Sequence, residues 1–165
     1  MSESSANGAE IIQNERHIVL AQVMLPADAN PSGDVHGGTL MKLADTAGGI
    51  AASRHARRRV VTAIADSMTF EAPVKVGDLV LLDALVTWVG RTSIEVQVSI
   101  HAEKVVTGER RRASQSYFVY VALGPDGRPH EVAPLELRTD AERDRFARAE
   151  ERPQFRLAQR SHPSS

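Results

Sequence analysis

The order of periodic segments limits the fold of this chain more than any other feature of its sequence. An apolar stripe at helical spacing predicts one helix over residues 38–55. The stripe consists of Leu40, Leu43, Ala44, Ala47 and Ala51. Strand-like segments precede and follow it, at 17–25, 60–70, 78–89, 94–105 and 110–123. Because parallel strand pairs need crossover helices and only one helix is available, we predict an α+β fold in which an antiparallel sheet wraps around that helix.

The length of 165 residues suits a single globular domain. We predict a flexible polar tail over 1–14, the folded domain over 15–136 and a charged extension over 137–165. Within that extension, residues 140–160 are predicted to form a helix interrupted at Pro153.

Charge and composition exclude several classes of protein. The chain has 20 basic and 21 acidic side chains, so nothing drives it toward nucleic acid or an anionic membrane. It has no cysteine, which excludes disulfides, cysteine-ligated metals and a cysteine nucleophile. There is no secretory signal and no apolar run long enough to span a bilayer. We therefore expect a cytoplasmic protein with no nucleic-acid or membrane partner.

The segment NPSGDVHGGTLMKLAD (30–45) carries most of the candidate chemistry. Gly37 and Gly38 begin the predicted helix, where free amides could hold an oxyanion; they could equally serve only a tight turn. Asp45 could act as a general base or nucleophile, or be a surface or interface acid paired with an arginine. Asn30 could orient a water or a substrate, or simply form a turn.

Two further residues are candidates for supporting parts. His36 could be a base, although a lone loop histidine is more often a hydrogen-bonding or packing residue. Asp66 is predicted on one strand face with Ile64 and Met68, either as a buried structural anchor, which we favour, or as a group facing the pocket. No phosphate-binding loop, HExxH or GxSxG motif occurs, and no metal site is predicted.

Basic residues cluster at 54–59, at Arg91 and at 110–112. Aromatic residues are too few for an interleaved nucleic-acid surface, so most of these cations are expected to be solvated. The loop 90–93 combines Arg91, Thr92 and Ser93 with a glycine and is a candidate phosphate site.

One face of the predicted helix lies beside the apolar stripe and carries Met41, Asp45, Gly48 and Ala52. Mid-helix glycines destabilise a helix unless another group approaches closely. We therefore predict that this face meets a second copy of the chain.

The segment NPSGDVHGGTLMKLADTAGGIAASRH resembles the signature of hotdog-fold acyl-CoA thioesterases. The likeness continues through VVTAIADSMTFEAPVKVGD, GRTSIEVQVSIHAEKV and RRRASQSYFVYVALGPDGRP, and is closest to the cytosolic acyl-CoA hydrolase branch, some members of which carry two hotdog domains. It implies a hotdog fold, in which a curved antiparallel sheet wraps a long central helix. It also implies pairing into a double-hotdog dimer with active sites at the interface, and larger assemblies such as a trimer of dimers.

The resemblance also implies a reaction and the residues that perform it. Acyl-CoA and water would give free CoA and a carboxylic acid, without a metal or redox cofactor. Asn30 matches the asparagine of the family's loop motif and Asp45 its helical acid, with Gly37 and Gly38 holding the oxyanion. A homodimer would take Asn30 from one subunit and Asp45 from the other. The CoA end is assigned to Arg91, Thr92, Ser93 and Lys104.

Two alternatives remain open at this stage. A hotdog hydratase or dehydratase would use a histidine, and His36 is the available residue. A non-catalytic acyl-CoA-binding regulator would carry a DNA-binding extension, and no helix-turn-helix segment is present.

Overall fold

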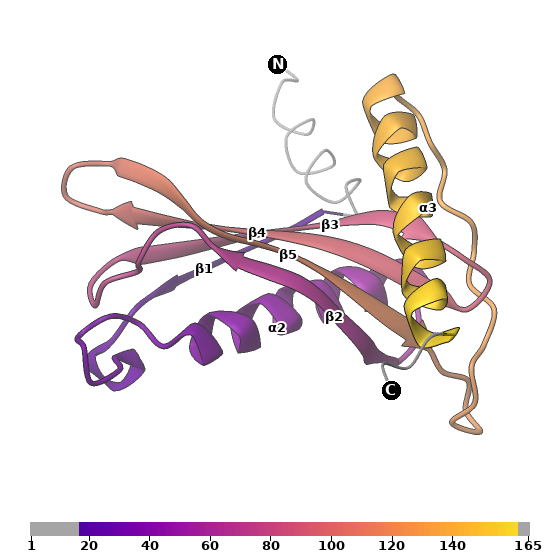
Figure 1. Cartoon of the computed structure of the whole chain (residues 1–165), viewed down its shortest axis with the longest axis horizontal. Coiled ribbons are helices and arrows are strands. Elements are labelled where there is room, and N and C mark those ends of the chain that lie inside the picture. Colours follow the sequence, from indigo (N-terminus) through magenta and orange to yellow (C-terminus); the bar gives the residue numbers. More distant parts are fainter. Residues whose placement is uncertain (1–16, 162–165) are drawn as a thin grey trace, which may run out of the picture.

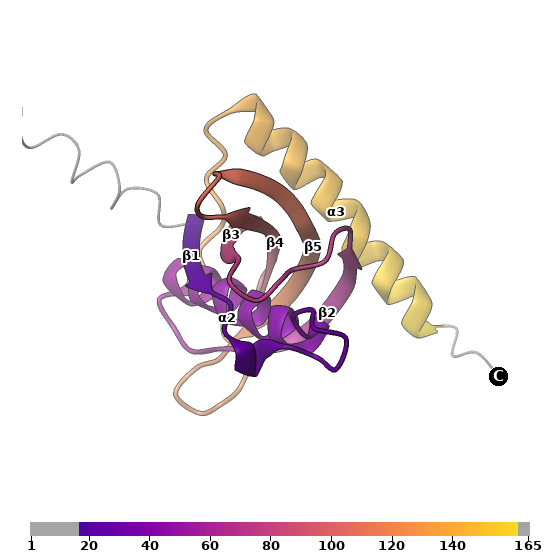
Figure 2. The same cartoon turned by 90° about the vertical axis from the view of Figure 1, so that its left-hand side faces the viewer.

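The structure, a computed structural model, describes residues 17–161, with side chains as far as Arg152. Its five strands form one antiparallel sheet in the order β1-β3-β4-β5-β2. They are β1 (His17–Val23), β2 (Val60–Phe70), β3 (Leu79–Val89), β4 (Ser93–Lys104) and β5 (Glu109–Ala122). A short 3₁₀ turn, η1 (Pro26–Asp28), follows β1. Helix α2 (Gly37–Ala56) lies along the concave face of the sheet, and α3 (Asp140–Ser161) lies against the convex face (Figure 1, Figure 2).

The core lies between α2 and the concave face. On β4, alternate residues from Ile94 to Ala102 are fully buried, because successive side chains of a strand point to opposite faces of the sheet. On α2 the predicted stripe is also buried, with Leu43 only partly so. The α+β arrangement of one helix wrapped by an antiparallel sheet is therefore confirmed.

Strand β2 forms one edge of the sheet, and two β-bulges change which way its side chains point. The register shifts once between Thr62 and Ile64 and again between Asp66 and Met68, where Ser67 adopts a φ of 39°. Asp66 consequently pairs with Tyr117 while Met68 pairs with Ser116 on the opposite face. The prediction that Asp66 shares a face with Met68 is wrong, because the extra residue reverses the alternation.

The predicted interruption of the last helix at Pro153 is also wrong, since α3 continues from Asp140 to Ser161. A proline removes a single i→i−4 hydrogen bond, and the turns on either side retain theirs.

The outer face of β4 is covered at one acidic residue. Glu95 has no exposed surface, because α3 covers this part of the convex face. Arg152 of α3 donates Nη2 to Glu95 Oε1 at 2.7 Å and Nε to Oε2 at 3.1 Å. Thr87 donates to the same carboxylate at 2.7 Å. This buried ion pair attaches α3 to the sheet.

The described part of the chain contains no helix long and apolar enough to cross a bilayer. The proposed tail at 1–14 lies outside the described residues, and the three-part division of the chain stays a prediction.

Candidate active site

Asp45 lies half-buried on α2, where two side chains hold one of its carboxylate oxygens. Thr62 on β2 donates its hydroxyl to Asp45 Oδ1 at 2.8 Å. The Tyr120 hydroxyl on β5 lies 3.2 Å from the same oxygen and 2.9 Å from the Asp45 carbonyl. Among the described residues, none donates a hydrogen bond to Oδ2. A carboxylate fixed through one oxygen and open at the other can accept a proton from a bound water.

Gly48 makes the contact between Tyr120 and Asp45 possible. The Tyr120 side chain is almost fully buried under α2. A Cβ atom at Gly48 would lie 2.4 Å from the Tyr120 hydroxyl, so only glycine leaves room for it. Burial, together with the charge and the hydrogen bond of Asp45, raises the pKa of Tyr120 well above its usual range. Tyr120 therefore stays protonated and remains a hydrogen-bond donor.

Asn30 organises the loop that precedes α2. Its Oδ1 accepts hydrogen bonds from the amides of Ser32 at 2.9 Å and Asp34 at 3.2 Å. Gly33 allows this turn because its φ of +84° is one that residues with a side chain rarely adopt. The Asn30 Nδ2 group donates to none of the described residues. The side chain therefore shapes the loop through its oxygen and keeps an N–H₂ donor for a ligand.

The loop and the beginning of α2 border a shallow hollow. Gly37 and Gly38 are the first residues of α2, and their amides donate to no backbone oxygen of the described residues. The hollow has a volume of ≈330 Å³, and Asn30, Gly37 and Phe70 are among its lining residues. Phe70 passes so close to Gly37 that an added Cβ would meet its ring at 3.2 Å. Asn30 and Gly37 thus border the same hollow.

Asp45 is not part of this hollow within a single chain. It lies eight residues beyond Gly37, which corresponds to about 12 Å along an α-helix. The two predicted catalytic residues, Asn30 and Asp45, therefore lie at separate places on one protomer.

The two predicted supporting residues also lie apart from Asp45. His36 precedes α2 with an exposed side chain that makes no capping hydrogen bond. Asp66 borders a depression beside Arg148 and Arg152 of α3, on the convex face of the sheet. It is half-buried, so the expectation of a buried anchor facing the core does not hold.

The four residues predicted to bind CoA do not form one cluster. Arg91, Thr92 and Ser93 lie at the start of β4, and Lys104 lies at its end. These ends are about 36 Å apart at the usual rise of a strand. Arg91 pairs with Glu131 at 3.5 Å, and Lys104 pairs with Glu109 at 3.0 Å.

Comparison with known proteins shows which family this chain belongs to. A family model described as "Thioesterase superfamily" matches residues 32–109. The acyl-CoA thioester hydrolase YciA of Salmonella typhimurium is 42% identical over 115 residues, which are 68% of this chain and 86% of that protein. This chain belongs to the thioesterase superfamily.

Other members of the superfamily extend the likeness. The mouse cytosolic acyl coenzyme A thioester hydrolase is 35% identical over 77% of this chain, which corresponds to 34% of the mouse protein. The resemblance to hotdog acyl-CoA thioesterases, including the cytosolic branch, is thus confirmed.

Solved structures of superfamily members superpose closely on this one. An acyl-CoA hydrolase from Staphylococcus aureus, solved with butyryl coenzyme A and coenzyme A, has a TM-score of 0.82 at 34% identity, over 90% of each chain. The same enzyme has been solved with an asparagine, an aspartate or a threonine replaced by alanine. A hexameric acyl-CoA thioesterase has a TM-score of 0.86 at 32% identity, over 92% of this chain and 97% of its own. The hotdog fold is therefore confirmed.

Sequence reasoning missed Thr62 and Tyr120 as partners of Asp45 in this thioesterase-superfamily chain. Gly48 was the available signal, because a mid-helix glycine predicts a close approach. The approaching group is Tyr120 of the same chain, so the prediction that Gly48 meets a second helix is wrong. Ala52 on that helix face is likewise fully buried within the protomer, whereas Met41 is 44% exposed.

Proposed function

We propose that this chain hydrolyses acyl-CoA thioesters to free CoA and carboxylic acids, with Asp45 as the general base. The main support for this proposal is the state of the Asp45 carboxylate. Thr62 and Tyr120 hold its Oδ1, and no described residue donates a hydrogen bond to its Oδ2. A base must be fixed in orientation and still reach the proton that it removes.

The Staphylococcus aureus structures support this assignment. Their replaced asparagine, aspartate and threonine follow one another at the same spacing as Asn30, Asp45 and Thr62 in this chain. That enzyme is an acyl-CoA hydrolase solved with butyryl coenzyme A. The correspondence favours thioester hydrolysis over a hydratase reaction based on His36, whose exposed side chain is oriented by no hydrogen bond from the described residues.

The proposed chemistry begins with a water bound between Asp45 and the thioester carbonyl. Asp45 removes a proton while the water oxygen attacks the carbonyl carbon, and the carbonyl oxygen becomes an oxyanion. The amides of Gly37 and Gly38 stabilise this oxyanion at the positive end of the helix dipole. The C–S bond then breaks, and the proton held by Asp45 passes to the leaving thiolate of CoA. The scheme requires no metal or redox cofactor.

We further propose that each site is completed by two protomers. Asp45 and the Asn30–Gly37 hollow are separated along α2 within one chain. Next to Asp45, β2 is a sheet edge that pairs only with β5 among the described strands, so a second protomer can lie against it. Asn30 would orient the water or the carbonyl at Asp45 of the partner. Hexameric relatives support an assembly built from such dimers, and we propose a trimer of dimers.

A site between protomers also changes the proposal for CoA. Arg91, Thr92 and Ser93 lie at the opposite end of β4 from Lys104, so one CoA would use only one of these groups from a given protomer. We retain both groups as candidates contributed by different subunits. We also propose a cytoplasmic location, which agrees with the name of the mouse relative, a cytosolic acyl coenzyme A thioester hydrolase.

The decisive experiment measures thiol release from a panel of acyl-CoAs. We expect Asp45→Ala to reduce turnover by roughly a hundredfold or more, the usual effect of losing a general base. Asp45→Asn keeps the shape of the side chain and should lose as much turnover as Asp45→Ala, because an amide cannot act as the base that accepts the proton. Asp144→Asn, an exposed acid on α3, is the matched control and should turn over like the wild type. Wild-type rates in both Asp45 variants would exclude the mechanism.

A further inference from the structure

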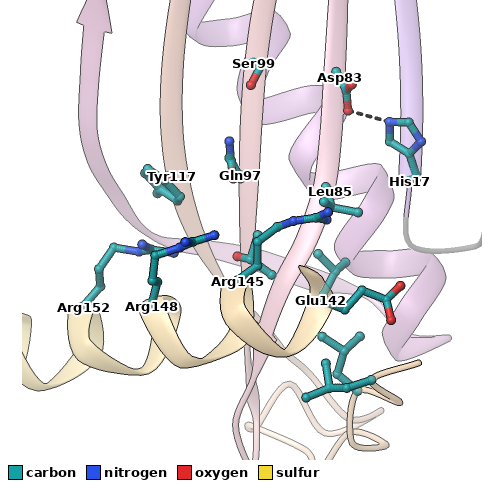
Figure 3. Close-up of a pocket in the computed structure, with 14 residues that line it drawn as sticks. His17, Asp83, Leu85, Gln97, Ser99, Tyr117, Glu142, Arg145, Arg148 and Arg152 are labelled. Carbon is teal, nitrogen blue, oxygen red and sulfur yellow. Dashed lines mark hydrogen bonds and ion pairs between the residues drawn. The ribbon is translucent and has the colours of Figure 1, made fainter. Parts of the chain in front are cut away.

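A large cavity bordered by described residues lies on the side of the sheet opposite the candidate active site. It has a volume of ≈710 Å³ and lies between α3 and the convex face (Figure 3). Its floor is made of outward-facing side chains of β3, β4 and β5. Helix α2, which carries Asp45, lies on the concave face (Figure 2). The cavity is large enough for a small-molecule ligand and separate from the proposed thioesterase site.

Three arginines of α3 line the roof of this cavity. Arg145, Arg148 and Arg152 follow one another at helical spacing and extend over the strands in Figure 3. The charge of Arg152 is neutralised by its ion pair with Glu95. Its guanidinium also stacks over the Tyr117 ring, 4.1 Å from the ring centroid. Within the described part of the chain, Arg145 and Arg148 form no ion pair.

The acids that line the cavity are engaged elsewhere. Glu142 accepts the amides of Arg138 at 2.6 Å and Thr139 at 3.1 Å and so caps the start of α3. Asp83 is bonded to His17 at 2.5 Å. Asp83 and Glu142 thus share the cavity with Arg145 and Arg148 but form no ion pair with them among the described residues. Two guanidinium groups without an ion-pair partner beside a polar cavity can bind an anion.

The shape and polarity of the lining indicate what kind of anion would fit. Gln97, Ser99 and Tyr117 supply polar groups on the floor beneath the arginines. Arg145 and Arg148 are three residues apart, about 4.5 Å along the helix axis, so their guanidinium groups can contact neighbouring phosphates rather than a single carboxylate.

We infer that this cavity is a second ligand site, which binds a small molecule carrying a diphosphate group through Arg145 and Arg148. The ligand forms the ion pairs that Arg145 and Arg148 lack among the described residues and bridges α3 to the polar floor of the sheet. Because it contacts both, it holds α3 against the convex face and adds to the effect of the Arg152–Glu95 pair. The source of the diphosphate is either inorganic pyrophosphate or a nucleotide, whose base would contact apolar side chains of the lining such as Leu85, Leu135 and Leu137.

The test is calorimetric titration of the full chain with pyrophosphate, ADP and orthophosphate. We expect pyrophosphate and ADP to bind, and the double variant Arg145→Gln/Arg148→Gln to lose at least tenfold in affinity for both. Arg143→Gln is the matched control, because Arg143 lies on the same helix, pairs with Asp140 and does not line the cavity. Its affinity should equal that of the wild type. ADP binding more tightly than pyrophosphate would identify the ligand as a nucleotide; equal affinities would identify the diphosphate alone.

Hydrogen exchange locates the bound ligand independently of any enzymatic activity. Pyrophosphate should protect amides of α3 and leave exchange unchanged in residues 30–45 and at the candidate CoA-binding residues 91–93 and 104. The inference is overturned if the wild-type chain binds neither diphosphate or if the double variant binds them as tightly as the wild type. Protection confined to residues 30–45, 91–93 and 104 would also overturn it.

Discussion

At the scale of single residues, the space at Gly48 is the detail with the largest expected consequence. In Gly48→Ala the new methyl group would lie 2.4 Å from the Tyr120 hydroxyl and force it away from Asp45. We expect a loss of about 1–3 kcal/mol in the free energy of unfolding, as for other overpacked cores, and a parallel loss of turnover. Denaturant unfolding measures the loss of stability, and a thiol-release assay measures the loss of turnover.

Gly49→Ala provides the comparison, since a Cβ there would meet only Tyr120 Cε1 at an ordinary 3.7 Å. Alanine favours helix by roughly 0.8–1 kcal/mol over glycine, so this variant should be as stable as the wild type or more stable. Equal effects of the two substitutions would contradict the role assigned to Gly48.

Tyr120 also predicts how stability depends on pH. Its pKa is raised in the folded chain, first by burial and then by Asp45, above the value near 10 that it has when unfolded. The unfolded chain therefore loses this proton first. The stabilisation is complete below about pH 10 and declines above it, by up to about 1.4 kcal/mol per pH unit.

Denaturant unfolding between about pH 9 and pH 11 measures this decline. The free energy of unfolding of Tyr120→Phe should fall less steeply over that range than that of the wild type. The comparison uses slopes, because the variant also lacks the hydrogen bond to Asp45 at every pH. Parallel profiles would show that Tyr120 ionises equally in the folded and unfolded chains.

At the scale of elements, the attachment of α3 depends on Arg152. Arg152→Ala removes both guanidinium bonds to the fully buried Glu95 carboxylate. Removing one partner of a buried ion pair leaves the other charge uncompensated and costs about 3–5 kcal/mol, so we expect a loss of that size in the free energy of unfolding and faster proteolysis of α3. Arg143→Ala, which breaks an exposed pair on the same helix, should change stability by less than about 1 kcal/mol. Proteolysis of α3 at wild-type rates in Arg152→Ala would mean that other contacts hold the helix.

At the scale of the whole molecule, the separation of Asn30 from Asp45 predicts complementation between subunits. Asn30→Ala and Asp45→Ala are each expected to be inactive, and each keeps the half-site that the other lacks. After dissociation and mixing in equal amounts, half of the dimers contain one subunit of each kind, and each of these holds one intact site. Thiol release should recover to roughly a quarter of the wild-type level for random pairing of a symmetric dimer.

The same mixture assembled without dissociation is the control and should remain inactive. If mixed dimers recover no activity, each site lies within a single subunit, and the two-protomer proposal is wrong although Asp45 can still be the base.

The sequence predicted the backbone elements more completely than the contacts of the side chains. The helix and all five strands follow from local periodicity, and each predicted end lies within two residues of the observed one, apart from α3 at Pro153. Asn30, Gly37, Gly38 and Asp45 were also candidates from sequence, because loop and helix-start chemistry is local.

Local pattern was enough to predict the α+β order of elements, the apolar face of α2 and a short list of polar candidates, and the family resemblance added the hotdog fold. Three features emerge only when the chain is folded: Thr62 and Tyr120 hold Asp45, Glu95 is buried under Arg152, and bulges place Asp66 on the convex face. Periodicity records which way a side chain points from its own element. It carries no information about which distant element covers that face, nor about a single inserted residue that reverses it.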